Sequence, residues 1–263
     1  MFQFWKFATA GIICGSLLLG DPALANSIKQ GYRVSLLGVD VYEVTLAINL
    51  KQNSYAAQLG LEAAGMAGFL SSGRIDATAR GNLAKGTAQP QTFTMSSDTF
   101  GEKHKLSVVW KPEAAPQTKR NFKITPATNA AISKVLSSST LGPLAALISH
   151  LILPSKKACS GAKRVYTGKA VYDYSLTPQG TEKLNGEDEG SYRGTAYKCR
   201  ATYRRIAGVS GKFVEAMQDN PPSPVTVWYA PISQGNSKML LPVAAVTKVK
   251  GQAVKIRLHQ AGD

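Results

Sequence analysis

The sequence predicts a mainly β fold, in which a large curved antiparallel sheet or half-open β-barrel packs one or two short helices in or against its concave face. Three observations support this prediction. Apolar and polar residues alternate with a period of two in many segments, as in half-buried strands. One strongly apolar segment has helical spacing instead. A long sheet with so few helices to cover it is expected to curl around them.

The N-terminal segment has the pattern of a cleavable signal peptide. A short charged region precedes the apolar stretch Phe7 to Gly20, and Ala23 and Ala25 form an Ala-x-Ala cleavage site. The fourteen apolar-stretch residues are too few to span a bilayer. We therefore expect residues 1–25 to be removed after Sec-type export. Residues 26–263 are predicted to be a single β-rich periplasmic domain with no transmembrane segment.

The first strands follow this leader directly. Tyr32, Val34 and Leu36 share one face, the stretch Tyr42 to Leu50 repeats the alternation, and Gly38 between them predicts a tight hairpin. The alternation recurs at Leu106, Val108 and Trp110, at Phe122 and Ile124, at Val225, Val227 and Tyr229, and at Val254, Ile256 and Leu258.

The segment from Gly142 to Pro154 is predicted to be a buried helix. Its large apolar residues recur at i, i+3, i+4, i+7 and i+8, and Pro143 suits the first helical turn. No charged residue marks a solvent face, so we expect His150 to pack on the helix rather than to bind a metal. A weaker helical stretch follows Pro126. The predicted apolar plug of the concave face consists of Leu144, Leu147, Ile148, Leu151 and Ile152.

Two cysteines remain after cleavage, Cys159 and Cys199. An even number in an exported chain is typical of a disulfide, which we expect to join the bases of the strands on either side of the enclosed loop. That loop is predicted at Thr177 to Ser191, which contains proline, glycine and an acidic cluster. A second exposed loop is predicted at Asp219 to Pro224.

The mature chain is strongly basic, with 30 basic and 15 acidic residues and a net charge of +15. Such an excess favours polyanions. Export excludes nucleic acid as the partner, which leaves anionic lipid headgroups, lipopolysaccharide and acidic wall polymers. Solubility and the protection of strand edges are alternative roles for the same cations. The predicted basic surface, placed by strand parity, consists of Lys198, Arg200, Arg204, Lys255 and Arg257.

No motif predicts a catalytic, cofactor-binding or metal site. The sequence from Gly208 to Gly211 lacks the Gly-x-Ser-x-Gly spacing of a hydrolase elbow. The histidines His104, His150 and His259 occur singly, without the spacing of metal ligands. We therefore expect a protein that is not an enzyme and uses no cofactor.

Several short motifs extend over most of the mature chain. They are Gly31 to Asp40, the helix sequence Leu-Gly-Pro-Leu-Ala-Ala-Leu from Leu141, Cys159 followed by Val165 to Lys169 and Tyr172 to Tyr174, and Cys199. Together they resemble a proteobacterial envelope family known as a domain of unknown function (thirty-one-oh-eight). The resemblance implies a fold similar to the curved-sheet carriers of lipoprotein localisation and to periplasmic β-spiral proteins. It implies no catalytic residues.

Two functions fit these observations. The first is a non-enzymatic periplasmic binding protein for cell-envelope homeostasis, with an apolar lumen for a lipid or lipidated protein and a basic exterior for an anionic headgroup. The second is a structural or interaction protein that docks to cell wall, lipopolysaccharide or envelope proteins through its basic surface. We expect the first, in the periplasm or peripheral on an envelope membrane. A concave face filled with packed side chains would contradict a lumen of this kind.

Overall fold

The computed structural model describes residues 26–65, 73–84, 86–99, 101–186, 190–208, 223–234, 237–249 and 251–259. The predicted signal peptide and most of the predicted loop from Asp219 to Pro224 lie outside these residues. Across the described parts of the chain, no helix combines the length and the apolar character needed to cross a bilayer.

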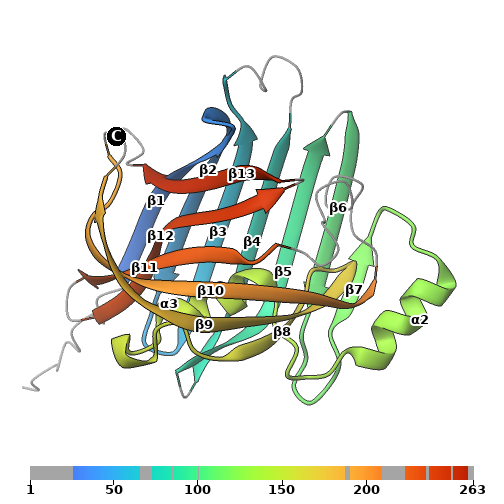
Figure 1. Ribbon diagram of the computed structural model, residues 1–263. Coiled ribbons are helices and arrows are strands. Elements are labelled where there is room, and N and C mark those ends of the chain that lie inside the picture. Colours follow the sequence, from blue (N-terminus) through green and yellow to red (C-terminus); the bar gives the residue numbers. More distant parts are fainter. Residues whose placement is uncertain are drawn as a thin grey trace, which may run out of the picture.

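The described strands form one antiparallel sheet of thirteen strands (Figure 1). The strands are β1 (Asn26–Leu36), β2 (Val39–Leu50), β3 (Ser54–Ala63), β4 (Arg74–Ala84), β5 (Thr87–Thr99), β6 (Glu102–Val109), β7 (Gln117–Arg120), β8 (Ala162–Tyr166), β9 (Ala170–Asn185), β10 (Arg193–Gly208), β11 (Val225–Gln234), β12 (Ser237–Val249) and β13 (Gln252–His259). Their spatial order is β7-β6-β5-β4-β3-β2-β1-β13-β12-β11-β10-β9-β8. The first and last of the described strands therefore pair in the middle of the sheet.

The alternation in the sequence sets the register of the first strands. Ile28 lies opposite Ile48 and Tyr32 opposite Val44, so that the apolar residues of β1 and β2 share one buried face. Leu36 pairs with Val39 across a two-residue turn, which confirms the predicted hairpin.

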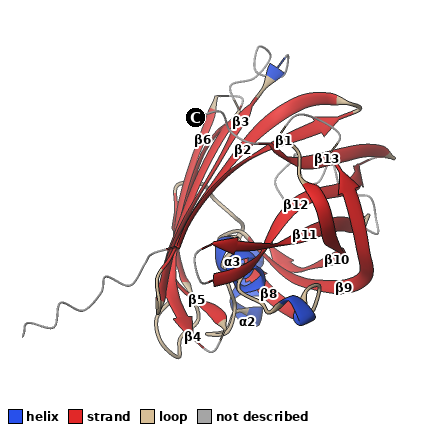
Figure 2. Ribbon diagram, turned by 90° about the vertical axis from the view of Figure 1, so that its left-hand side faces the viewer, coloured by secondary structure: helices blue, strands red, loops and turns tan. Residues whose placement is uncertain are grey.

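The sheet curves around helix α3 (Pro143–Leu151), which lies on its concave side (Figure 2). The helix contacts β4, β5, β8 and β12. Its polar Ser149 is fully buried, and the Ser149 hydroxyl accepts a 3.0 Å hydrogen bond from the Ala88 amide of β5. Of the predicted plug residues, Leu144, Ile148 and Leu151 are buried, whereas Leu147 and Ile152 are half-buried.

The second helix, α2 (Pro126–Val135), packs against β9 and β10 and buries only Ile132. The predicted fold class is therefore confirmed: the protein is mainly β, with a curved open sheet and two short α-helices among the described residues. A 3₁₀-helix, η1 (Ser155–Lys157), follows α3.

Side chains connect the two edge strands of the sheet, β7 and β8. The Tyr166 hydroxyl of β8 lies 2.9 Å from the Thr118 hydroxyl of β7, and Arg120 of β7 donates to the Gly168 carbonyl at 3.0 Å. Leu141 extends the edge further, because its amide and carbonyl both bond to β8. Trp110 holds this segment in place by donating its indole N–H to the Thr140 carbonyl at 2.7 Å.

The predicted loop from Thr177 to Ser191 is partly wrong, because β9 continues through it to Asn185. Pro178 lies opposite Cys199 at an irregularity in the β9–β10 register. A bulge of this kind accommodates a residue that has no backbone N–H for the ladder.

The predicted disulfide between Cys159 and Cys199 is confirmed, with the two Cα atoms 5.1 Å apart. Its position differs from the expected one. Cys199 lies in the middle of β10, and Cys159 lies in the turn after η1. The bond therefore ties the segment that follows α3 to the sheet, instead of joining the bases of two strands.

Candidate functional site

The register places two of the predicted basic residues in one row across four strands. Lys198 of β10 lies opposite Trp228 of β11, Trp228 lies opposite Ala244 of β12, and Ala244 lies opposite Arg257 of β13. Directly opposed residues of antiparallel strands project from the same face. The cations of β10 and β13 therefore flank an apolar strip formed by the two strands between them.

A second row runs beside the first on the same face. Arg200 lies opposite Thr226, Thr226 lies opposite Val246, and Val246 lies opposite Lys255. Arg204 is the exception among the five predicted residues. It lies further along β10, opposite Asp173 of β9, and forms an ion pair with that carboxylate at 3.7 Å.

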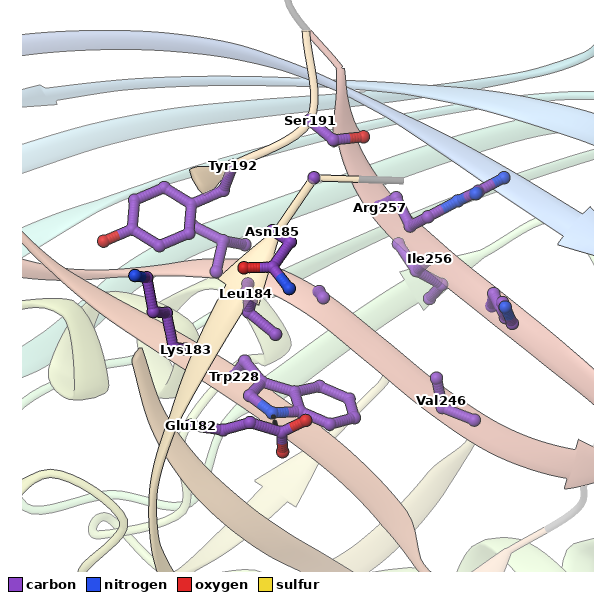
Figure 3. Close-up of a pocket in the computed structure, with 14 residues that line it drawn as sticks. Glu182, Lys183, Leu184, Asn185, Ser191, Tyr192, Trp228, Val246, Ile256 and Arg257 are labelled. Atoms are coloured by element: carbon purple, nitrogen blue, oxygen red, sulfur yellow. Dashed lines mark hydrogen bonds between the residues drawn. The ribbon is translucent and has the colours of Figure 1, made fainter. Parts of the chain in front are cut away.

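The end of the β9–β10 hairpin meets this strip and forms a pocket of about 400 Å³ (Figure 3). Glu182, Lys183 and Asn185 come from β9, and Tyr192 precedes β10. The apolar lining consists of Leu184, Tyr192, Trp228, Val243, Ala244, Val246 and Ile256. The charged lining consists of Glu182, Lys183, Lys255 and Arg257. The pocket lining is therefore of mixed apolar and polar character and has more cations than anions.

Trp228 is fixed by a small polar network at one side of this pocket, which we call the Trp228 pocket. Its indole N–H donates to the Glu182 carboxylate at 3.0 Å, and the Lys198 ammonium lies 2.9 Å from the same carboxylate. Lys198 also lies 5.5 Å from the centre of the Trp228 ring. Hydrogen bonds from Lys198 and then Trp228 lower the pKa of Glu182. Glu182 therefore stays ionised and offsets Lys198, while Lys255 and Arg257 stand across the pocket.

The lumen expected from the sequence is occupied by α3. Leu144, Ile148 and Leu151 are at most 4 % exposed and belong to one large apolar cluster with the inner residues of the sheet. No residue of α3 lines the Trp228 pocket. The open pocket of mixed character is thus separate from the predicted plug helix.

A second hollow, of about 560 Å³, lies beside β8 and is lined mainly by polar residues. Arg164 makes two hydrogen bonds to Asp173, at 2.8 and 3.0 Å, and these bonds lower the pKa of that carboxyl group. Because Asp173 is engaged by Arg164 and Arg204, it is not placed to act as a general base. The residues that the structure describes contain no group of three His, Cys, Asp or Glu side chains arranged to hold a metal ion.

Neither Trp228 nor Glu182 was predicted as a site residue from the sequence. Strand parity already separates Trp228 from Val227 and Tyr229, and so predicts that its ring lies on the basic face. Glu182 could not be found in this way, because its segment was expected to be a loop. The curl of the β9–β10 hairpin over the strip is a tertiary feature without a local sequence signal.

The chain was compared with protein families, with curated proteins and with solved structures. A crystal structure of a β-barrel-like protein of domain of unknown function DUF1849 from Brucella abortus is 7 % identical, covers 90 % of this chain and 97 % of its own, and has a TM-score of 0.48. No protein with a curated description matches the sequence. The family described as protein of unknown function (DUF3108) matches residues 31–258. The chain therefore belongs to the DUF3108 family.

Proposed function

We propose that the protein is a non-enzymatic binding protein of the periplasm that holds an acyl chain with an anionic headgroup in the Trp228 pocket. The observation that carries the proposal is the apolar strip at Trp228, which is bordered on one side by Lys255 and Arg257 of β13. An amphipathic anion matches both parts of this lining.

The size and chemistry of the pocket support such a ligand. Its volume of about 400 Å³ falls within the ~300–1,000 Å³ that is usual for small-molecule sites. Each methylene group transferred from water to the apolar lining contributes roughly 0.8 kcal/mol. A carboxylate or phosphate gains charge-assisted hydrogen bonds from a guanidinium group such as that of Arg257. The acyl chain thus supplies affinity, and the headgroup fixes the orientation.

The natural fluorescence of Trp228 provides a direct test. After cleavage the chain contains two tryptophans, Trp110 and Trp228, and Trp110 is buried in the core. We would titrate a Trp110→Phe variant with dibromostearate, whose bromine atoms quench indole fluorescence on contact. Saturable quenching at near-unit stoichiometry is expected. Absence of quenching in a variant with wild-type circular dichroism would reject the pocket as an acyl site.

The headgroup end is tested by neutralising the two cations. Lys255→Gln and Arg257→Gln are each expected to weaken dibromostearate binding about tenfold, as for the loss of one hydrogen bond to a charged group. Lys111→Gln removes an exposed cation that does not line the pocket and serves as the matched control. Equal affinity in all three variants would show that the headgroup does not meet Lys255 or Arg257.

A docking protein for anionic wall polymer or lipopolysaccharide is the second candidate. Arg200 and Arg204 favour it, because both are exposed and neither lines the Trp228 pocket. Strongly salt-dependent retention on lipopolysaccharide, without quenching of Trp228 by dibromostearate, would favour this function over the first.

A further inference from the structure

The turn between β1 and β2 presents two apolar side chains to solvent. Leu37 is 67 % exposed and Val39 is 55 % exposed, and these are the highest values for large hydrophobic residues in the described part of the chain. Val109 of β6 follows at 38 %. Isolated exposed residues of this kind are common on protein surfaces, but two at one hairpin tip form a small exposed apolar patch.

The backbone at this tip does not favour leucine. Leu37 has φ 54° and Gly38 has φ 84°, so both residues of the two-residue turn are in the left-handed region. A type I′ turn of this form prefers Asn, Asp or Gly at its first position. A leucine at this position disfavours the turn conformation, and it also exposes an apolar side chain to water. A contact outside the chain would account for a residue that opposes both local preferences.

Cations lie on the strands beside the tip. Lys255 of β13 is opposite Ser35, two residues before Leu37. Lys248 of β12 is exposed and lies opposite Ala253 of β13. The next residue, Val254, lies opposite Leu36.

Alternate residues of β12 share a face, so Lys248 and Lys255 lie on the same side of the sheet. Val39 lies opposite Leu36, whose partner on β13 is Val254, so the Val39 side chain projects from the other side. The tip therefore presents its apolar and basic side chains together only to a surface that it meets end-on.

We propose that the β1–β2 tip docks the protein on an anionic lipid bilayer, with Leu37 and Val39 in the headgroup–acyl boundary and Lys248 and Lys255 against anionic headgroups. Interfacial binding needs only a shallow apolar insertion supported by cations. A stable protein interface needs roughly 800 Å² from each partner, more than two side chains supply. Lys255 also lines the Trp228 pocket, so docking would bring that pocket to the lipid surface.

The substitution Leu37→Asn separates docking from folding. Asn-Gly is a favoured type I′ pair, so the variant is expected to unfold at the same temperature as the wild type or higher. Its binding to phosphatidylglycerol–phosphatidylethanolamine vesicles, measured by co-sedimentation, is expected to fall about tenfold because an apolar anchor is lost. The protein used is residues 26–263, which contain every described strand and helix.

Matched variants test the other parts of the surface. Val39→Thr is expected to weaken vesicle binding, whereas Val109→Thr makes the same change on β6 and is expected to leave it unchanged. Lys248→Gln is expected to weaken binding about fivefold, as for one cation at an anionic surface. Pure phosphatidylcholine vesicles should bind the wild type poorly.

Three outcomes would overturn the proposal. These are wild-type vesicle binding by Leu37→Asn, equal binding to phosphatidylcholine, or a change of oligomeric state on size exclusion that assigns the tip to a second copy. The proposal does not rest on acyl binding. Arg257→Gln with weakened dibromostearate binding and wild-type vesicle binding would leave docking standing. Leu37→Asn with wild-type binding of both vesicles and dibromostearate would overturn docking and leave the pocket standing.

Discussion

His150 is a titratable side chain enclosed in the apolar core. It lies in the last turn of α3, is 3 % exposed, and neither ring nitrogen has a hydrogen-bond partner among the described residues. The Tyr174 ring meets it edge-on, with the ring centres 5.5 Å apart. Burial, together with the smaller effect of the nearby Lys163 ammonium, lowers the pKa of His150 to about 4. The imidazole is therefore neutral at physiological pH.

This burial predicts a loss of stability in mild acid. The unfolded state has the ordinary His150 pKa near 6.5, so it binds more protons than the folded state between about pH 6.5 and 4. The free energy of unfolding therefore falls as the pH drops through this window, by about 3 kcal/mol from this residue. Urea unfolding near neutral pH and near pH 4 measures the loss. In His150→Leu, the unfolding free energy should fall less between neutral pH and pH 4 than in the wild type. In His104→Gln, which changes a more exposed histidine, it should fall as much as in the wild type.

Periodicity predicted most elements of the fold. The alternation at Tyr32 to Leu36 and the helical spacing from Leu144 both correspond to elements of the structure, because their apolar faces are buried or half-buried against the core. The second half of β9 was missed. Pro178 and Gly180 are strong local turn signals, and only pairing with β10 across a bulge overrides them. The Trp228 pocket is formed by the same hairpin, so local sequence patterns could not predict it.

Helix α3 is expected to be a fixed part of the core. Ile148 is fully buried, and Ile148→Ala should lower the free energy of unfolding by about 2–5 kcal/mol through lost contacts and a residual cavity. Leu147 is half-buried on the same helix, so Leu147→Ala is the matched control and should cost about 1 kcal/mol. If both variants lost only a small, equal amount of unfolding free energy in denaturant, α3 would not be a fixed part of the core. That result would indicate a helix that can move out of the concave face.

The disulfide stabilises the connection after α3. It closes a segment with a sequence separation of 40, for which loop entropy predicts a contribution of about 4 kcal/mol. Cys199→Ser should lower the free energy of unfolding by up to this amount. The denatured wild type should show no free thiol without reductant, and stoichiometric labelling of both cysteines would contradict the bond.

The whole molecule is built on one sheet, so we expect it to unfold in one transition. Trp110 follows β6 in the N-terminal half of the sheet, and Trp228 lies on β11 in the C-terminal half. Fluorescence of Trp228→Phe and Trp110→Phe variants therefore reports each half separately. Unfolding midpoints that coincide with the loss of circular dichroism within each variant are expected for a cooperative unit. A transition of one half before the loss of overall β structure would indicate two domains.

The pairing of β1 with β13 determines when the sheet can be completed. Of the described strands, synthesis produces β1 first and β13 last, and contacts such as that between Tyr32 and Leu258 join residues that are far apart in the sequence. Such distant pairings slow folding. Until the final strand is available, β1 has an unpaired backbone edge that can recruit another chain. A chain terminated before Gln252 keeps that edge permanently open, which makes the last strand the one that protects a nascent molecule from aggregation.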